Sequence, residues 1–169
     1  MASNMKAVKL RIKSVQSTMQ ITKAMELVAS SKLRKAKERA ETCRPYFTEL
    51  HETLKDIARE NIDFSSVYAR ESSNPRYCYV AIAGDRGLAG GYNANLFKCL
   101  EAAAEGKDYV VLPIGKKAVE YFRQRGIECL TDKFAEIADI SVADCFEIAN
   151  LLCEEFRKGT FGHIELCYT

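Results

Sequence analysis

The stretch ITKAMELVASSKLRKAKERA, residues 21–40, lies in the middle of the pattern that decides the fold of this chain. From residue 8 to residue 57, positions spaced alternately four and three apart are almost all apolar, and Thr22 and Glu26 are the exceptions. The positions of this repeat are Val8, Ile12, Val15, Met19, Thr22, Glu26, Ala29, Leu33, Ala36, Ala40, Cys43, Phe47, Leu50, Leu54 and Ile57. A repeat of about 3.5 residues keeps one stripe of a helix against a partner helix in a left-handed coiled coil. We therefore expect one long helix over residues 6–58, with a coiled-coil seam that includes Val8, Ile12, Val15, Met19, Ala29, Leu33, Ala36 and Ala40.

The length of this helix argues against an ordinary amphipathic helix that lies on its own domain. At about 1.5 Å per residue it would span roughly 80 Å, whereas a domain made of the rest of the chain is about 30 Å across. An internal proline removes one backbone hydrogen bond, so we expect a bend or a short break at Pro45. No second segment of similar length and period follows in this sequence, so the partner stripe must come from another chain or from sequence outside this one.

Positive charge is concentrated in the same segment. Residues 1–40 contain ten lysines and arginines against two acidic residues, a net charge of +8, so residues 41–169 carry −6 of the total of +2. A basic rod on an acidic body predicts an acidic partner along the rod. Nucleic acid is one candidate, but the first forty residues contain no aromatic side chain on which bases could stack.

Composition narrows the class of protein further. No run of about 20 apolar residues is present, so no membrane span is expected, and the N-terminus lacks the apolar core of a signal peptide. Seven widely spaced cysteines with no Cys-x-x-Cys pair indicate reduced thiols in a cytosolic protein. His51 and His163 have no clustered ligands around them, so we expect no metal and no cofactor.

From Pro75 onward the hydrophobic pattern is that of an α/β domain. Four short apolar runs indicate strands, at residues 77–83, 108–114, 127–130 and 163–168. The stretches between them indicate helices, at residues 93–105, 116–125 and 141–157, the last opened by a capping box of Ser141 and Asp144. This alternation predicts a Rossmann-like parallel sheet with right-handed crossovers. We expect a coiled-coil helix over 1–60, a polar linker over 61–74 and an α/β domain over 75–169 that is incomplete at its C-terminus.

A glycine-rich turn, GDRGLAGG at residues 84–91, follows the first strand and precedes a helix, where phosphate-binding loops lie. Its G-x-x-G-x-x-G-G spacing differs from the dinucleotide fingerprint, and no Gly-Lys-Ser/Thr follows, so it is not a P-loop. Arg86 could hold an anion or could pair close to Asp85. The pattern favours a tight turn that needs positive φ or a close backbone approach over a nucleotide site.

No arrangement of nucleophile and base is visible in the sequence. It contains no Gly-x-Ser-x-Gly and no histidine in a motif with serine or cysteine, and Glu154 and Glu155 are more simply a solvated helix surface. We therefore expect no independent catalytic activity. The residues leave two other functions open: a basic coiled-coil adaptor with an α/β docking domain, for which nucleic acid is a candidate partner, and a small Rossmann-like nucleotide enzyme.

Three ordered motifs extend across the chain: ITKAMELVASSKLRKA (21–36), RPY (44–46) and DRGLAGGYNANLFK (85–98). The first resembles the N-terminal helix of the gamma subunit of F-type ATP synthase, and the third resembles the second signature of that family. The RPY tripeptide falls between them, where the family has the same three residues. Ala89 stands where many relatives carry cysteine, a change from one small side chain to another. The resemblance covers essentially the whole chain.

The resemblance implies a non-catalytic central-stalk rotor, which couples proton- or sodium-driven rotation of the c-ring to ATP synthesis in the α3β3 hexamer. In that family the N-terminal helix pairs with a C-terminal helix, the α/β domain bears on ε and the c-ring, and the catalytic sites belong to β. The implied partners are α, β, ε and the c-ring, with no nucleic acid and no direct membrane insertion, at the cytoplasmic face of a bacterial cell membrane. By the same resemblance, the residues expected to contact partners are Lys23, Met25, Lys32, Arg34, Lys35, Arg86, Leu88 and Ala89.

One difference from that family concerns length. Its members continue well beyond the point where this sequence stops, as far as the C-terminal helix. We therefore expect the sequence to be a fragment or a truncated gene product, with near-zero ATPase activity by itself. We also expect its exposed seam to cause self-association, or fraying of residues 1–40.

Overall fold

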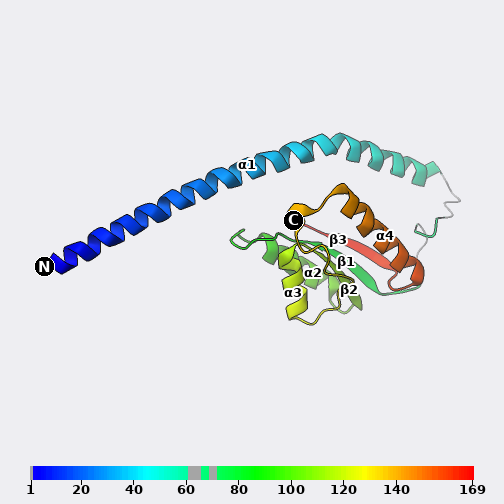
Figure 1. The fold of residues 1–169 in the computed structure, drawn as a ribbon. Helices are drawn as coiled ribbons and strands as arrows, with labels where there is room; N and C mark the ends of the chain where they lie inside the picture. Colours follow the sequence, from blue (N-terminus) through cyan, green and yellow to red (C-terminus); the bar gives the residue numbers. More distant parts are fainter. Residues whose placement is uncertain (1, 61–65, 69–71) are drawn as a thin grey trace. The chain divides into compact units, whose positions relative to one another are not determined.

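The computed structural model describes residues 2–60, 66–68 and 72–169. The chain forms two compact units, 1–64 and 65–169. The first contains one helix and the second contains the sheet with its helices (Figure 1).

Helix α1 (Ala2–Glu60) is 59 residues long and extends the predicted helix at both ends. Pro45 lies inside it without interrupting it. A complete break is therefore absent, and Figure 1 shows the ribbon of α1 bending gradually in its cyan part. Proline leaves one carbonyl of the preceding turn without a donor. Because the side chains around Pro45 are exposed, water can reach that turn, and the helix bends instead of ending.

The second unit is built on a parallel sheet, as predicted, but the sheet has three strands where the sequence indicated four. Its strands are β1 (Tyr77–Ile82), β2 (Tyr109–Ile114) and β3 (His163–Cys167), in the spatial order β2-β1-β3. The predicted strand at 127–130 is wrong: this stretch contributes a single parallel bridge, between Cys129 and Val111. The Val111 amide donates to the Glu128 carbonyl and the Leu130 amide donates to the Val111 carbonyl, each at 2.9 Å, and no named strand continues the pairing.

Three helices connect the strands: α2 (Tyr92–Ala104), α3 (Lys116–Gln124) and α4 (Val142–Lys158). Their bounds agree with the predicted ones to within one residue. The capping box is confirmed, because the Asp144 amide donates to the Ser141 hydroxyl at 3.3 Å and the Ser141 amide donates to the Asp144 carboxylate at 2.8 Å. A short 3₁₀ turn, η1 (Ile137–Asp139), was not predicted.

Both faces of the sheet are covered, which explains why β1 reads as a continuous apolar run. On one face, Tyr79 and Ala81 of β1 pack with buried residues of α2 and α3, such as Leu100 and Phe122. On the other face, Cys78 and Val80 pack in a cluster that includes Ile148 of α4. Figure 1 shows α4 on the opposite side of the sheet from α2 and α3.

The predicted linker at 61–74 lies outside the described residues at 61–65 and 69–71. Its described parts contact the end of α4. The Tyr68 hydroxyl accepts a hydrogen bond from Arg157 Nε at 2.6 Å, and the Asn74 side-chain amide donates to the Gly159 carbonyl at 2.7 Å. These parts of the segment therefore belong to the second unit.

Candidate partner-binding surface

The predicted coiled-coil seam lies on the surface of α1. Every side chain of α1 from Met5 to Arg59 is exposed, so none of the described residues covers the seam. Leu33, in the middle of the seam, is 70% exposed. Thr22, one of the two polar seam positions, donates its hydroxyl to the Thr18 carbonyl at 3.0 Å. The helix itself satisfies this hydroxyl, so it does not oppose an apolar partner.

A second row of apolar side chains on α1 was missed by the sequence analysis. Leu10, Ile21 and Val28 are exposed and lie outside the seam. They are eleven and seven residues apart, which is about three and two helical turns, so they share one side of α1. The same spacing test that revealed the seam could have found them. Helix α1 therefore presents apolar side chains in more than one direction.

The five predicted partner-binding residues of α1 are all exposed and lie around the helix. Lys23 and Arg34 are about three turns apart and share a side, whereas Met25 and Lys32 are about two turns apart and share another. Lys35 lies about 100° further around than Arg34. Only Arg34 of these five has an ion pair, to Glu38 at 3.4 Å, within the part of the chain that the structure describes. The positive charge of this region therefore surrounds α1 and does not form one stripe.

The other three predicted partner-binding residues lie in the loop that connects β1 to α2. Arg86, Leu88 and Ala89 are exposed there, and Leu88 is the most exposed large apolar residue of the described chain. Its backbone has φ = 60°, and the φ of Gly90 is 59°. The glycine-rich segment is thus a tight turn with left-handed residues, as predicted. These three residues belong to the second unit, whereas the other five belong to the first.

Side chains from neighbouring elements hold the base of this loop. The Gly84 amide donates to Oδ1 of Asn93, in the first turn of α2, at 2.9 Å. The Gly84 carbonyl accepts from the Lys117 amide of α3 at 3.1 Å. Gly115 passes so close to β1 that a Cβ on it would lie 2.0 Å from the Ala83 carbonyl oxygen. The loop therefore leaves a tightly packed corner between β1 and α3.

Asp85 makes the densest set of contacts in the loop, and the sequence analysis gave it no role. Its carboxylate accepts hydrogen bonds from three backbone amides: Lys116 at 3.2 Å, Ile137 at 2.9 Å and Ala138 at 3.1 Å. Burial raises the pKa of this carboxyl, but the three amides and the charge of Lys116 outweigh it, so the pKa lies below its usual value. An ionised carboxylate already occupies the N-terminus of α3, and this disfavours a phosphate site there.

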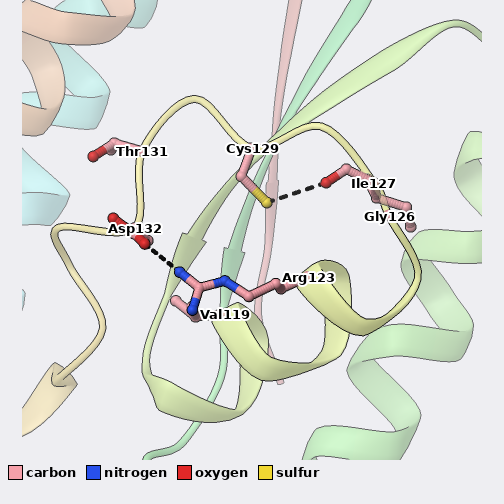
Figure 2. Close-up of a pocket in the computed structure, with 7 residues that line it drawn as sticks. All are labelled: Val119, Arg123, Gly126, Ile127, Cys129, Thr131 and Asp132. Carbon is pink, nitrogen blue, oxygen red and sulfur yellow. Dashed lines mark hydrogen bonds and ion pairs between the residues drawn. The ribbon is translucent and has the colours of Figure 1, made fainter.

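A hollow of about 400 Å³ lies between α3 and the stretch that follows it (Figure 2). Arg123 and Asp132 form an ion pair across it. The Cys129 thiol, which donates to the Ile127 carbonyl at 3.5 Å, has its pKa raised by burial. A thiol with a raised pKa is a weak nucleophile, so this hollow does not support a catalytic site. Among the described residues, no group of acidic, cysteine and histidine side chains is placed to hold a metal ion.

Comparison with known proteins assigns this arrangement to a family. Residues 4–169 match the protein family described as ATP synthase. The ATP synthase gamma chain of Ruminococcus albus is 50% identical over 99% of this chain. The chain belongs to the ATP synthase gamma chain family.

Other gamma chains match over the same range. The ATP synthase gamma chain of Acetobacterium woodii, whose name specifies sodium ion, is 36% identical over 100% of this chain. The ATP synthase gamma chain of Alkaliphilus metalliredigens is 41% identical over 100% of this chain. The matched regions make up 60%, 56% and 59% of the three relatives, so the chain spans less than two thirds of the length of these gamma chains.

Proposed function

We propose that this chain acts as the non-catalytic central-stalk rotor subunit of an F1Fo ATP synthase. In this role it couples proton- or sodium-driven rotation of the c-ring to ATP synthesis in the α3β3 hexamer. The observation that carries the proposal is α1, a helix of 59 residues whose described side chains from Met5 onward are all exposed. Most of the stability of a protein helix comes from the packing of its apolar face, so a helix with this exposure favours a place inside an assembly.

The seam supports a partner helix. Its small middle residues, Ala29, Ala36 and Ala40, allow two helices to approach closely and form a slender shaft. We propose that a further helix of the gamma subunit covers the seam, as the resemblance implies. The second apolar row would then face outward, toward the α and β subunits.

The distribution of charge supports a bearing that turns. Lys23, Lys32, Arg34 and Lys35 lie around α1, so they meet acidic surfaces at every angle of rotation. Exposed ion pairs are worth only about 0–1 kcal/mol each. Weak contacts spread over the circumference suit an axle, because a strong contact at one angle would stop it. We propose that these four basic residues contact the β subunit, together with Met25, Arg86, Leu88 and Ala89.

The proposal places no chemistry in this chain, since the catalytic sites of the complex belong to β. None of the described helices combines the length and the apolar character that a bilayer crossing requires. We propose that the chain is held at the cytoplasmic face of a bacterial cell membrane through ε and the c-ring. The name of the A. woodii relative specifies sodium, so protons and sodium ions are both candidate coupling ions for this chain.

Capture of the endogenous protein from detergent-solubilised membranes tests this proposal. An affinity tag on the N-terminus, followed by mass spectrometry of everything retained, should yield α, β, ε and c together. A matched sample washed at high salt should keep the complex, because salt does not screen the apolar contacts proposed between the second row of α1 and the α and β subunits, but should lose proteins held only by exposed charges. Recovery of the chain without α and β under both conditions would refute the rotor role.

A further inference from the structure

The loop between β1 and α2 contains a leucine whose exposure and backbone conformation are both unfavourable for the folded chain by itself. Leu88 is fully exposed and has a left-handed backbone. The left-handed region is unfavourable for any residue with a Cβ, and a leucine exposed to water gains nothing from burial. Outliers of this kind concentrate at functional sites, where the surrounding structure maintains them.

The tip of the loop has little packing of its own. All residues from Arg86 to Gly91 are exposed, and a Cβ placed on Gly87 or Gly90 would meet no atom within 4 Å. Such a segment is expected to be mobile unless its ends are fixed. The shape of the tip therefore depends on the residues at its base.

Asp85 fixes that base by joining parts of the chain that are far apart in sequence. Lys116, the first residue of α3, donates its amide to Oδ1, and so does Ile137 of η1. Ala138 donates its amide to Oδ2. These three donors come from the segments that follow β2, 31 to 53 residues along the chain. Because both carboxylate oxygens are used, the side chain has no freedom to rotate.

We propose that Asp85 is a positioning residue that preorganises the tip of this loop, so that Leu88 meets a partner as a preformed apolar contact. The inference deepens the proposed function, because it rests on the tip being a contact with the α3β3 hexamer. Preorganisation raises affinity by removing the entropic cost of ordering a loop on binding. Asp85 itself touches no partner in this scheme and acts only through the backbone that follows it.

Amide hydrogen exchange in the 169-residue chain tests the ordering. Asp85→Ala should accelerate exchange at the Tyr92 amide, which donates to the Ala89 carbonyl of the tip at 3.3 Å, while the amides of β1 and β2 keep their protection. Asp85→Asn should be intermediate, because Oδ1 can still accept from Lys116 and Ile137 but the amide nitrogen faces the N–H of Ala138. Asp132→Asn is the matched control, since Asp132 is an exposed aspartate that pairs with Arg123 instead of with backbone.

Binding to purified α3β3 tests the consequence. If the tip adopts the binding shape about a tenth of the time without its anchor, Asp85→Ala weakens binding about tenfold. A merely structural role would lower affinity whatever stands at position 88. The positioning role predicts that Asp85→Ala costs no further affinity once Leu88→Ala has removed the contact, so the double-mutant cycle shows strong coupling.

The outcomes separate the two proposals. Unchanged exchange at the tip of Asp85→Ala, or full additivity in the cycle, would overturn the positioning role. If Asp85→Ala does not fold, the same comparisons are made with Asp85→Asn. If the unaltered chain does not bind α3β3, the proposed contact fails, and the exchange experiment still decides whether Asp85 orders the tip.

Discussion

Single residues at the corner between β1 and α3 determine how the glycine-rich loop leaves the sheet. Gly115 has φ = 93° and lies against the Ala83 carbonyl. Gly126, at the other end of α3, also has a positive φ, of 66°, but open space surrounds it. Both glycines have a positive φ, but only at Gly115 would a Cβ also meet a neighbouring atom. Comparing substitutions at the two positions therefore shows how much the contact with Ala83 adds.

Gly115→Ala should destabilise the second unit much more than Gly126→Ala. A positive φ costs alanine about 1–2 kcal/mol at Gly126. It costs about 1–3 kcal/mol at Gly115, where ψ is 146° and the backbone is close to a region that is essentially restricted to glycine. At Gly115 the new Cβ also forces β1 and α3 apart, which raises the loss to about 2–4 kcal/mol. Thermal unfolding followed by the near-UV circular dichroism of the buried Tyr79 and the partly buried tyrosines around it measures both losses. Equal losses would show that the contact with Ala83 does not constrain the corner.

At the scale of elements, α4 shows how local sequence fixes a helix end. Ser141→Ala removes the hydroxyl that caps α4 and should lower stability by about 1 kcal/mol. For a domain of this size, that is a shift of about 4–8 °C in Tm. Ser73→Ala, at an exposed serine outside the helices, is the control. A loss no larger than that of the control would contradict the cap.

The same capping box makes α4 sensitive to acid. The side-chain and backbone hydrogen bonds from Ser141 hold the pKa of Asp144 below its usual value. The contribution is therefore complete above the ordinary pKa of an aspartate and is lost as the pH falls through the lowered value. Asp144→Asn should remove this part of the pH dependence below about pH 4, the ordinary pKa of an aspartate, measured by urea unfolding at each pH. A pH profile identical to that of the parent chain would rule out this role.

The exposed seam of α1 should make the 169-residue chain associate with itself. Leu33→Lys places a charge in the seam and should weaken association about tenfold or more, because one leucine loses its burial. Leu27→Lys is a close control, since Leu27 is 69% exposed and Leu33 is 70% exposed, but Leu27 lies outside the seam. Sedimentation velocity over a range of concentrations measures both. Equal effects would show that association does not use the seam.

At the scale of the whole molecule, positive charge is concentrated in residues 1–40 and the rest of the chain is acidic. We expect this separation of charge to act in binding to the other subunits. Reversing Lys32, Arg34 and Lys35 to glutamate should weaken binding to α3β3 about tenfold, because three exposed attractions become repulsions. Arg44, Lys55 and Arg59, reversed together, give a control with the same change of charge on exposed positions further along α1. Affinity measured at low and high salt checks the cause, since only an electrostatic loss shrinks as salt rises. If the control variant lost more affinity for α3β3, the contact with the hexamer would lie nearer the C-terminal end of α1.

The parts of this protein that the sequence determined are those whose physics is local. The repeat that gives α1 spans a few residues at a time, and the same holds for the apolar runs of β1 and β2 and for the capping box of Ser141. The family motifs are equally local, so the resemblance to gamma subunits could be read from them. Hydrogen bonding and burial within such short segments need no knowledge of the rest of the chain.

Only the tertiary structure decided the features that join distant segments. The stretch at 127–130 has strand-like composition, yet it makes one bridge because its pairing with β2 ends at Leu130. Asp85 is an ordinary turn residue in the sequence, and its role depends on amides that lie 31 to 53 residues away. Gly115 is required because β1 and α3 meet at its α-carbon. Such contacts depend on which elements become neighbours, and no local pattern encodes that choice.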